Sequence, residues 1–218
     1  MRIFKRLVSA LLVGVLCAGL CGADSHAEVK TVRSLKALEP TVVHITDPAS
    51  IKEYLESQGE EYDEDLVEII QYTYPELENG KGKIGTPDSP NEWGGYEFYT
   101  KNLSTYTTTD FSCLLKEYNR PAGKVSINES VSISNKFTAS AGIKAKYVEA
   151  ALSVTVEQTN TFSVSWENTY NYPVSIKVYP RYEVKTGELW EEDQWYDDYY
   201  GTFTFYRAVG DDVRVYRR

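Results

Sequence analysis

Apolar and polar side chains alternate along two neighbouring segments of the chain, residues 125–143 and 148–166. In the first segment the odd-numbered positions are mostly apolar and the even-numbered positions are polar or small; in the second segment the parity is reversed. Alternation with a period of two is typical of strands that bury one face. Two such arms in succession predict a long antiparallel hairpin over residues 124–167.

The two arms can be paired so that their apolar faces coincide. A two-residue turn at Ala145-Lys146 places opposite each other the pairs Ile143 and Val148, Ala139 and Leu152, Phe137 and Val154, Ile127 and Val164, and Val125 and Trp166. All of these pairs lie on one face, as the geometry of a strand requires.

The apolar face is continuous only toward the predicted turn. Glu129 and Asn135 interrupt it in the first arm, and Gln158 and Asn160 interrupt it in the second. The uninterrupted part has about ten residues in each arm, and a strand that crosses a membrane needs about 9–11. The candidates for membrane insertion are its apolar residues: Phe137, Ala139, Ala141, Ile143, Val148, Ala150, Leu152, Val154 and Val156.

Two alternatives remain open for this hairpin. Long strands rich in Ser, Thr and Val also occur in β-sandwiches, where one face packs on a second sheet. The residues near the turn also fit a helix over 143–152, because KAKYVEAAL has good helix-forming composition and a helical stripe of apolar residues. In either case the end of the hairpin would pack on the rest of the protein.

The remaining chain divides into a helical part and a β-rich part. In residues 28–78 the pattern predicts a strand at 42–46, a helix that begins after Asp47-Pro48 and ends near Gly59, and a second helix around residues 66–70. Residues 79–95 are rich in Gly, Pro, Asn and Asp and predict a linker. The fold class is therefore mainly β (α+β): a small strand-helix-helix unit precedes an elongated antiparallel β-sheet or sandwich over 96–218.

The first 27 residues have the features of a secretory signal peptide. A basic start is followed by an apolar run and by Ser25-His26-Ala27, which suits cleavage near Ala27. Removing its three basic residues and one acidic residue from totals of 23 and 32 leaves 20 and 31, a net charge of −11. So negative a protein is not suited to nucleic acid. We expect a secreted, extracellular protein.

The alternating hairpin resembles the insertion segment of aerolysin-like pore-forming toxins, including the relatives of epsilon-toxin and mosquitocidal toxin. The resemblance covers residues 124–185 and rests on the Ser/Thr-rich amphipathic pattern. It implies a protein that forms homo-oligomers and a pore in a membrane. The layout of leader, helical unit, Val/Ser hairpin and YPVSIKVYPRYEV also resembles uncharacterised secreted proteins of Gram-positive bacteria.

Residues with catalytic chemistry are few. His44 lies in a β-branched run typical of a structural histidine, and no Cys/His spacing suits a metal. We therefore expect no catalytic residues, no metal and no cofactor, and treat an extracellular hydrolase only as a third alternative. The first expectation is a secreted, non-enzymatic β-rich protein that acts through its surface and uses the long hairpin for self-association or membrane insertion.

The second expectation is a module that binds carbohydrate or cell wall. An acidic stretch near the C-terminus carries several aromatic rings that can stack on sugars. The candidates for ligand binding are Trp190, Trp195, Tyr196 and Tyr199.

Overall fold

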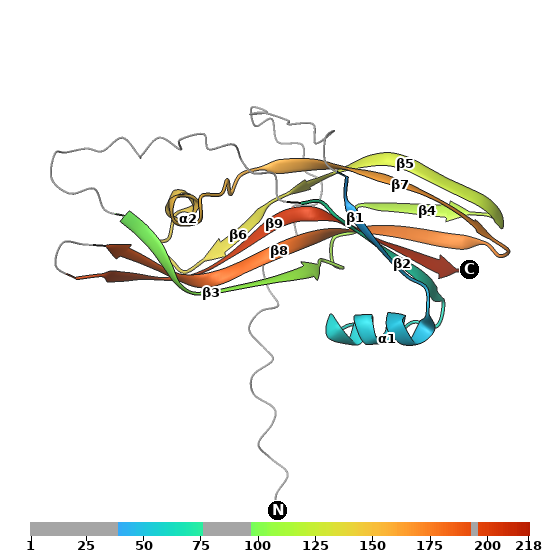
Figure 1. Ribbon diagram of the computed structural model, residues 1–218, viewed down its shortest axis with the longest axis horizontal. Coiled ribbons are helices and arrows are strands. Elements are labelled where there is room, and N and C mark those ends of the chain that lie inside the picture. The colour runs from blue at the N-terminus through green and yellow to red at the C-terminus, as the bar shows by residue number, and fades with distance from the viewer. Residues whose placement is uncertain (1–38, 76–96, 193–195) are drawn as a thin grey trace, which may run out of the picture. The chain divides into compact units, whose positions relative to one another are not determined.

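The computed structural model describes residues 39–75, 97–192 and 196–218, and Figure 1 shows how their elements are arranged. The strands are β1 (Thr41–Ile45), β2 (Leu66–Thr73), β3 (Glu97–Thr109), β4 (Lys116–Arg120), β5 (Gly123–Ser134), β6 (Lys136–Ala139), β7 (Thr159–Tyr170), β8 (Val174–Glu192) and β9 (Asp198–Arg217); the helices are α1 (Pro48–Ser57) and α2 (Ala145–Leu152). The strands pair antiparallel, which confirms the predicted mainly-β fold class. The predicted signal peptide (1–27) and linker (79–95) lie outside the described residues.

The large sheet is organised around the pair β8–β9. Its strand order is β1-β2-β9-β8-β3, and two short strands complete its edges. The edge of β8 that faces away from β9 pairs with β4 along Val174–Val178 and with β3 along Arg181–Glu192. The edge of β9 that faces away from β8 pairs with β6 along Phe203–Tyr206 and with β2 from Gly210 to Tyr216. Both long strands thus change partner part-way along their length.

A second sheet of two strands, β5 and β7, covers part of the large one. Its inward side chains, which include Val125, Ile127, Phe162 and Trp166, are buried in one cluster with Val174, Ile176, Val178, Val213 and Val215 of β8 and β9. Two facing layers of alternating apolar residues are the arrangement of a β-sandwich. The alternation in 125–134 and 159–170 therefore marks a half-buried sheet, as its period predicts.

The N-terminal elements follow the sequence up to α1 and then depart from it. Asp47 caps α1 by accepting from the Ser50 N–H at 2.9 Å, and Gly59 follows the helix with φ +75°. The second helix predicted around residues 66–70 is wrong, because this segment is β2 and lies between β1 and β9. A strand buried on both faces reads as a continuous apolar run, which periodicity cannot distinguish from a buried helix.

The hairpin prediction is confirmed for its stem and corrected in its register and its end. β5 and β7 pair from Gly123–Tyr170 to Ser134–Thr159, so Ile127 lies opposite Trp166 and not opposite Val164. A shift of two residues keeps every side chain on its face, so the hydrophobic pattern alone cannot exclude it. The predicted turn at Ala145-Lys146 is wrong, because these residues begin α2, which is the helical alternative.

A carboxyl group lies buried between the two layers. Asp211 of β9 is fully buried and pairs with Tyr72 of β2, whose hydroxyl donates to the Ser165 carbonyl of β7. Among the described residues, neither Asp211 oxygen has a hydrogen-bond partner. Burial, and then the neighbouring charge of Asp212, raise the pKa of Asp211 well above its usual range. The folded protein therefore favours the protonated form of this side chain.

Replacing Asp211 with Asn should reduce the loss of stability on raising the pH. A raised pKa means that the folded state binds the proton more tightly than the unfolded state does. The stabilisation is complete below the unfolded pKa of about 4 and is lost as the pH rises toward the folded pKa. Urea unfolding of both proteins at several pH values between 4 and 8 measures this. The wild-type free energy of unfolding should fall relative to that of D211N as the pH rises, and parallel curves would contradict the assignment.

Candidate functional site: the segment between β5 and β7

The chain between the two strands of the hairpin stem leaves them and crosses to the large sheet. We call residues 136–157 the tip segment. Its first part, β6, pairs with β9, so that Phe137 lies opposite Phe205 and Ala139 opposite Phe203. The segment then forms α2 and returns to β7 (Figure 1).

The candidates for membrane insertion fall into three groups by exposure. Val148, Val154 and Val156 are buried; Phe137, Ile143 and Leu152 are half-buried; Ala139, Ala141 and Ala150 are exposed. The buried members form one cluster with Leu189 of β8 and with Phe203 and Phe205 of β9. In this structure the apolar side chains of the tip segment therefore cover the part of the large sheet around Leu189, Phe203 and Phe205.

The helix in the tip segment depends on this packing for its stability. It has eight residues, and isolated helices shorter than about 12–15 residues are marginal in water. Lys144 at its N-terminus makes no side-chain capping bond, and Ser153 at its C-terminus adopts a left-handed conformation (φ 55°). Such a conformation is unfavourable for residues other than glycine. The ring of Tyr147 stacks on Phe98 of β3 with centroids 4.3 Å apart, which fixes α2 on the sheet.

A few polar contacts complete the attachment of the tip segment. Lys136 forms an ion pair with Asp110, and the Glu149 carboxylate accepts from the Val156 N–H at 2.7 Å. The Ser140 N–H donates to the Thr202 carbonyl at 2.9 Å, next to Gly201. A Cβ at position 201 would lie 2.8 Å from that of Ser140, so only glycine permits this approach.

Comparisons with known proteins do not identify the chain. No protein-family model matches it, and no curated protein is significantly similar to it. What the tip segment does must follow from its own contacts.

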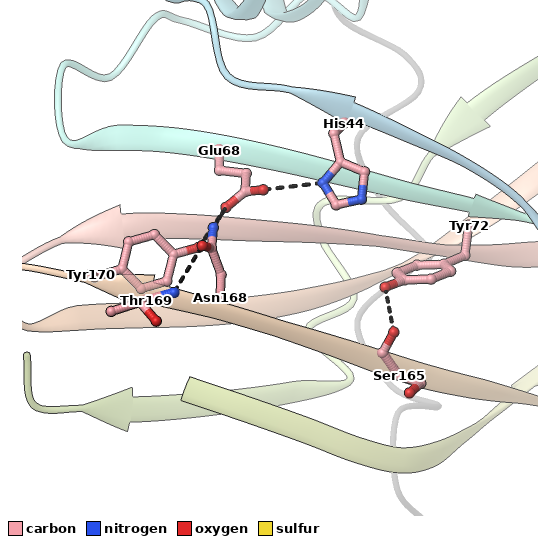
Figure 2. Close-up of polar contacts among 7 residues, drawn as sticks. All are labelled: His44, Glu68, Tyr72, Ser165, Asn168, Thr169 and Tyr170. Atoms are coloured by element: carbon pink, nitrogen blue, oxygen red, sulfur yellow. Dashed lines mark hydrogen bonds and ion pairs between the residues drawn. The ribbon is translucent and has the colours of Figure 1, made fainter. Parts of the chain in front are cut away.

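The stem of the hairpin is attached differently, through a buried carboxylate shown in Figure 2. Glu68 of β2 accepts hydrogen bonds from the Tyr170 hydroxyl and, at 3.1 Å each, from Asn168 Nδ2 and His44 Nδ1. Because Asn168 and Tyr170 belong to β7, these bonds join the two sheets. Two further hydroxyls of the β2 region, those of Tyr72 and Tyr74, donate to carbonyls of β7.

His44 therefore takes part in a contact between strands. Its Nδ1 faces Glu68, and the carboxylate is shared with two side chains of β7. Burial, and then the hydrogen bond and charge of Glu68, raise the pKa of Tyr170, so this hydroxyl remains a donor at neutral pH. The arrangement stabilises the stem, and its histidine has the hydrogen-bonded role that a β-branched run indicates.

Two of the candidates for ligand binding, Trp190 and Tyr199, are neighbours at one end of the large sheet. Trp190 of β8 lies opposite Tyr99 of β3 on one side and Tyr199 of β9 on the other. Tyr196 is 81% exposed, and Trp195 lies outside the described residues. The sequence does not point to Tyr99, because this residue becomes a neighbour of Trp190 only through strand pairing.

A lysine side chain also lies among these rings. The Lys101 ammonium is 3.9 Å from the centroid of the Trp190 ring and 5.2 Å from that of Tyr99. The same nitrogen is 3.4 Å from Asp197 Oδ2, which also accepts from the Tyr99 hydroxyl. Lys101 and Asp197 were not expected from the sequence; the only signal was that Tyr99 and Lys101, two residues apart, share a face.

The part of the chain that the structure describes lacks two other kinds of site. No cluster of three or more His, Cys, Asp or Glu side chains there could hold a metal ion. None of the described helices combines the length and the apolar character needed to cross a membrane.

Replacing Tyr170 with Phe should destabilise the junction between the stem and the large sheet. The change removes one bond to a buried carboxylate, which costs about 1–3 kcal/mol in free energy of unfolding. Urea denaturation measures the change. Tyr106, half-exposed on β3, provides a matched control: Y106F should be within about 0.5 kcal/mol of wild type. Equal effects of the two substitutions would contradict the role of the Glu68 contacts.

Proposed function

We propose that the protein is secreted and acts, without catalysis, on membranes: the tip segment leaves the large sheet and extends β5 and β7 into one long amphipathic hairpin. The observation that carries this proposal is the register of the stem. Beyond the last paired residues, Ser134 and Thr159, the Asn135 N–H still donates to the Gln158 carbonyl at 2.8 Å. The pairing therefore points into the tip segment before the two chains separate.

Continuing this register places the apolar residues of the tip segment opposite one another. The resulting pairs are Phe137 and Val156, Ala139 and Val154, Ala141 and Leu152, and Ile143 and Ala150. All lie on the face that carries Val131 and Ile133 in the stem. Residues 136–145 give an arm of ten residues, the length that a tilted membrane strand needs (about 9–11).

The charged residues of the tip segment also match in this register. Lys136 comes to lie opposite Glu157, and Lys144 opposite Glu149, on the polar face. Opposite charges directly across an antiparallel pair are stabilising, whereas like charges are not. In the present structure these residues have other surroundings: Lys136 pairs with Asp110, and Glu149 accepts from a backbone N–H. The sequence of the tip segment is thus compatible with two sets of partners.

Release of the tip segment requires a new apolar environment both for the segment itself and for the sheet surface that it covers. Burial of a side chain such as Val148 or Phe205 contributes about 1.5–3 kcal/mol, and release of the tip segment would expose several at once. Lipid tails can cover the hairpin. Release of β6 also frees the edge of β9 along Phe203–Tyr206, and an unpaired edge can add a strand from a second copy of the chain. Oligomerisation on a membrane would meet both needs.

The stem contacts support this division of the hairpin. Glu68, Tyr72 and Tyr74 hold β7 to the large sheet by hydrogen bonds and do not contact the tip segment through them. Release of the tip segment therefore leaves the core between the two layers intact.

The second candidate function, binding of carbohydrate or cell wall, depends on the rings around Trp190. Its support is the exposure of Tyr196 and Tyr199 beside carboxylates. However, the Lys101 ammonium covers a face of the Trp190 ring in this structure, so a sugar would have to displace it before stacking on that face. The tip segment therefore provides the stronger proposal.

A disulfide between β6 and β9 should abolish membrane activity reversibly. Thr138 lies directly opposite Thr204, so T138C/T204C can lock the tip segment on the sheet. Vesicles of phosphatidylcholine loaded with a self-quenching dye measure leakage. The oxidised double variant should leak at least about tenfold more slowly than wild type, with recovery on reduction; T138C treated identically is the control.

The register has its own readout in the same assay. A polarity-sensitive dye on single cysteines at 137–156 should report lipid contact at odd positions up to 145 and at even positions from 148. A helical period, no response to vesicles, or leakage by the locked variant would each refute the extended hairpin.

A further inference from the structure

The rings around Trp190 already hold a cation, the ammonium group of Lys101. We call Tyr99, Trp190, Tyr199 and Asp197 the ammonium cage. The Lys101 nitrogen lies over the Trp190 ring at 3.9 Å and near Tyr99 at 5.2 Å. A cation within about 6 Å of an aromatic centroid is attracted to the negative face of the ring, and tryptophan is the best such partner.

The walls of the cage are held in place by contacts of their own. Trp190 Nε1 donates to Glu188 Oε2 at 3.1 Å, and the Trp190 ring contacts the Tyr199 ring with centroids 5.2 Å apart. The Tyr99 hydroxyl donates to Asp197. These contacts do not involve the Lys101 side chain, although Lys101 also contacts Asp197, so we expect the rings to keep their arrangement when that side chain moves away.

The charge of the cage depends on that lysine. Asp197 and Glu188 place two carboxylates beside the rings, and Lys101 is the cation that the structure places among them. Its side chain is 41% exposed, so it can leave toward solvent. The vacated cage then presents aromatic faces and negative charge, which favour a cation that loses little hydration on entry. Quaternary ammonium groups have this property, and aromatic cages are the usual sites that recognise them.

We propose that the ammonium cage binds the quaternary ammonium group of a phosphocholine lipid, and that Lys101 occupies the cage in the free protein. On binding, the displaced Lys101 ammonium can pair with the lipid phosphate, which is linked to the choline by two carbons. The lipid source of the group rests on the proposed membrane function, whereas the cation site rests only on the cage.

The cage lies on the same strands as the surface that holds the tip segment. Successive residues of a strand point to opposite faces. Leu189 packs in the cluster with the tip segment, and the next residue, Trp190, belongs to the cage; Phe98 contacts Tyr147, and Tyr99 belongs to the cage. A headgroup bound in the cage would therefore contact the same strands as the tip segment, on their other face.

Titration with tetramethylammonium chloride tests the cation site without lipid. Chemical shifts of the Trp190 indole N–H and of the β8 amides should change saturably, and sodium chloride at equal ionic strength should not reproduce the change. W190L should weaken binding roughly tenfold or more. K101A should tighten it several-fold because the internal competitor is gone, a gain that a merely structural lysine would not give. Y106A on the same strand should match wild type.

Flotation with vesicles tests the source of the group. Wild type should bind phosphatidylcholine vesicles better than phosphatidylglycerol vesicles, and tetramethylammonium should compete.

Failure of tetramethylammonium to bind, or unchanged affinity in K101A, overturns the cage. Binding of tetramethylammonium without preference for phosphatidylcholine overturns the lipid source. Shifts of the same residues by oligosaccharides alone overturn the proposal in favour of a glycan site. If wild type does not bind tetramethylammonium and W190L causes the same dye leakage as wild type, the cage is overturned but the proposed function still stands.

Discussion

The pairing of β8 with β9 along almost their whole length is the interaction on which the other elements depend. Nineteen and twenty residues long, these strands offer more edge than any single neighbour covers. Each edge is therefore divided between two partners: β4 and β3 along β8, β6 and β2 along β9. The outer edges of a long strand pair must be covered by other strands, because unpaired backbone groups can pair with other chains. In β9, the cover along Phe203–Tyr206 is the short strand of the tip segment.

The two halves of the hairpin are consequently attached by different physical means. The stem is joined to the large sheet by a shared core and by hydrogen bonds to Glu68, a carboxylate that would be costly to leave unpaired. The tip segment is joined mainly by apolar contacts and one short sheet pairing, with the Lys136–Asp110 ion pair beside them, and its helix is too short to be stable alone. Apolar burial is non-directional, so another apolar environment can replace it, whereas the geometry of the Glu68 contacts cannot be replaced so simply. The structure thus attaches the stem and the tip segment to the large sheet by different kinds of contact.

The sequence predicted the features that depend on a local period and missed those that depend on distant partners. The stem, the β-rich C-terminal half and the capped helix after Asp47 followed from alternation and capping residues. β2 was mistaken for a helix because Leu66, Ile69 and Ile70 are buried on both faces of a central strand, where no alternation remains.

The register and the sites show the same limit. A shift of two residues is invisible to a pattern of period two, so the true register emerged only from the pairs themselves. The contact of Lys101 with Trp190 joins residues of different strands, and no local pattern contains it.

The register of the stem changes which residues of the tip segment would lie opposite each other in an extended hairpin. With the turn assumed from the sequence, Lys136 and Lys144 would face Thr155 and Tyr147. If the observed register of the stem is continued, they would face Glu157 and Glu149. The packed structure uses neither of these pairs. A segment that only had to cover the sheet would need apolar residues at the positions of Val148, Val154 and Val156. The packed arrangement also uses Lys136 and Glu149, but it does not require Glu157 and Lys144 to stand opposite them in a hairpin. Both requirements are met by one sequence, which is the property expected of a segment with two folded arrangements.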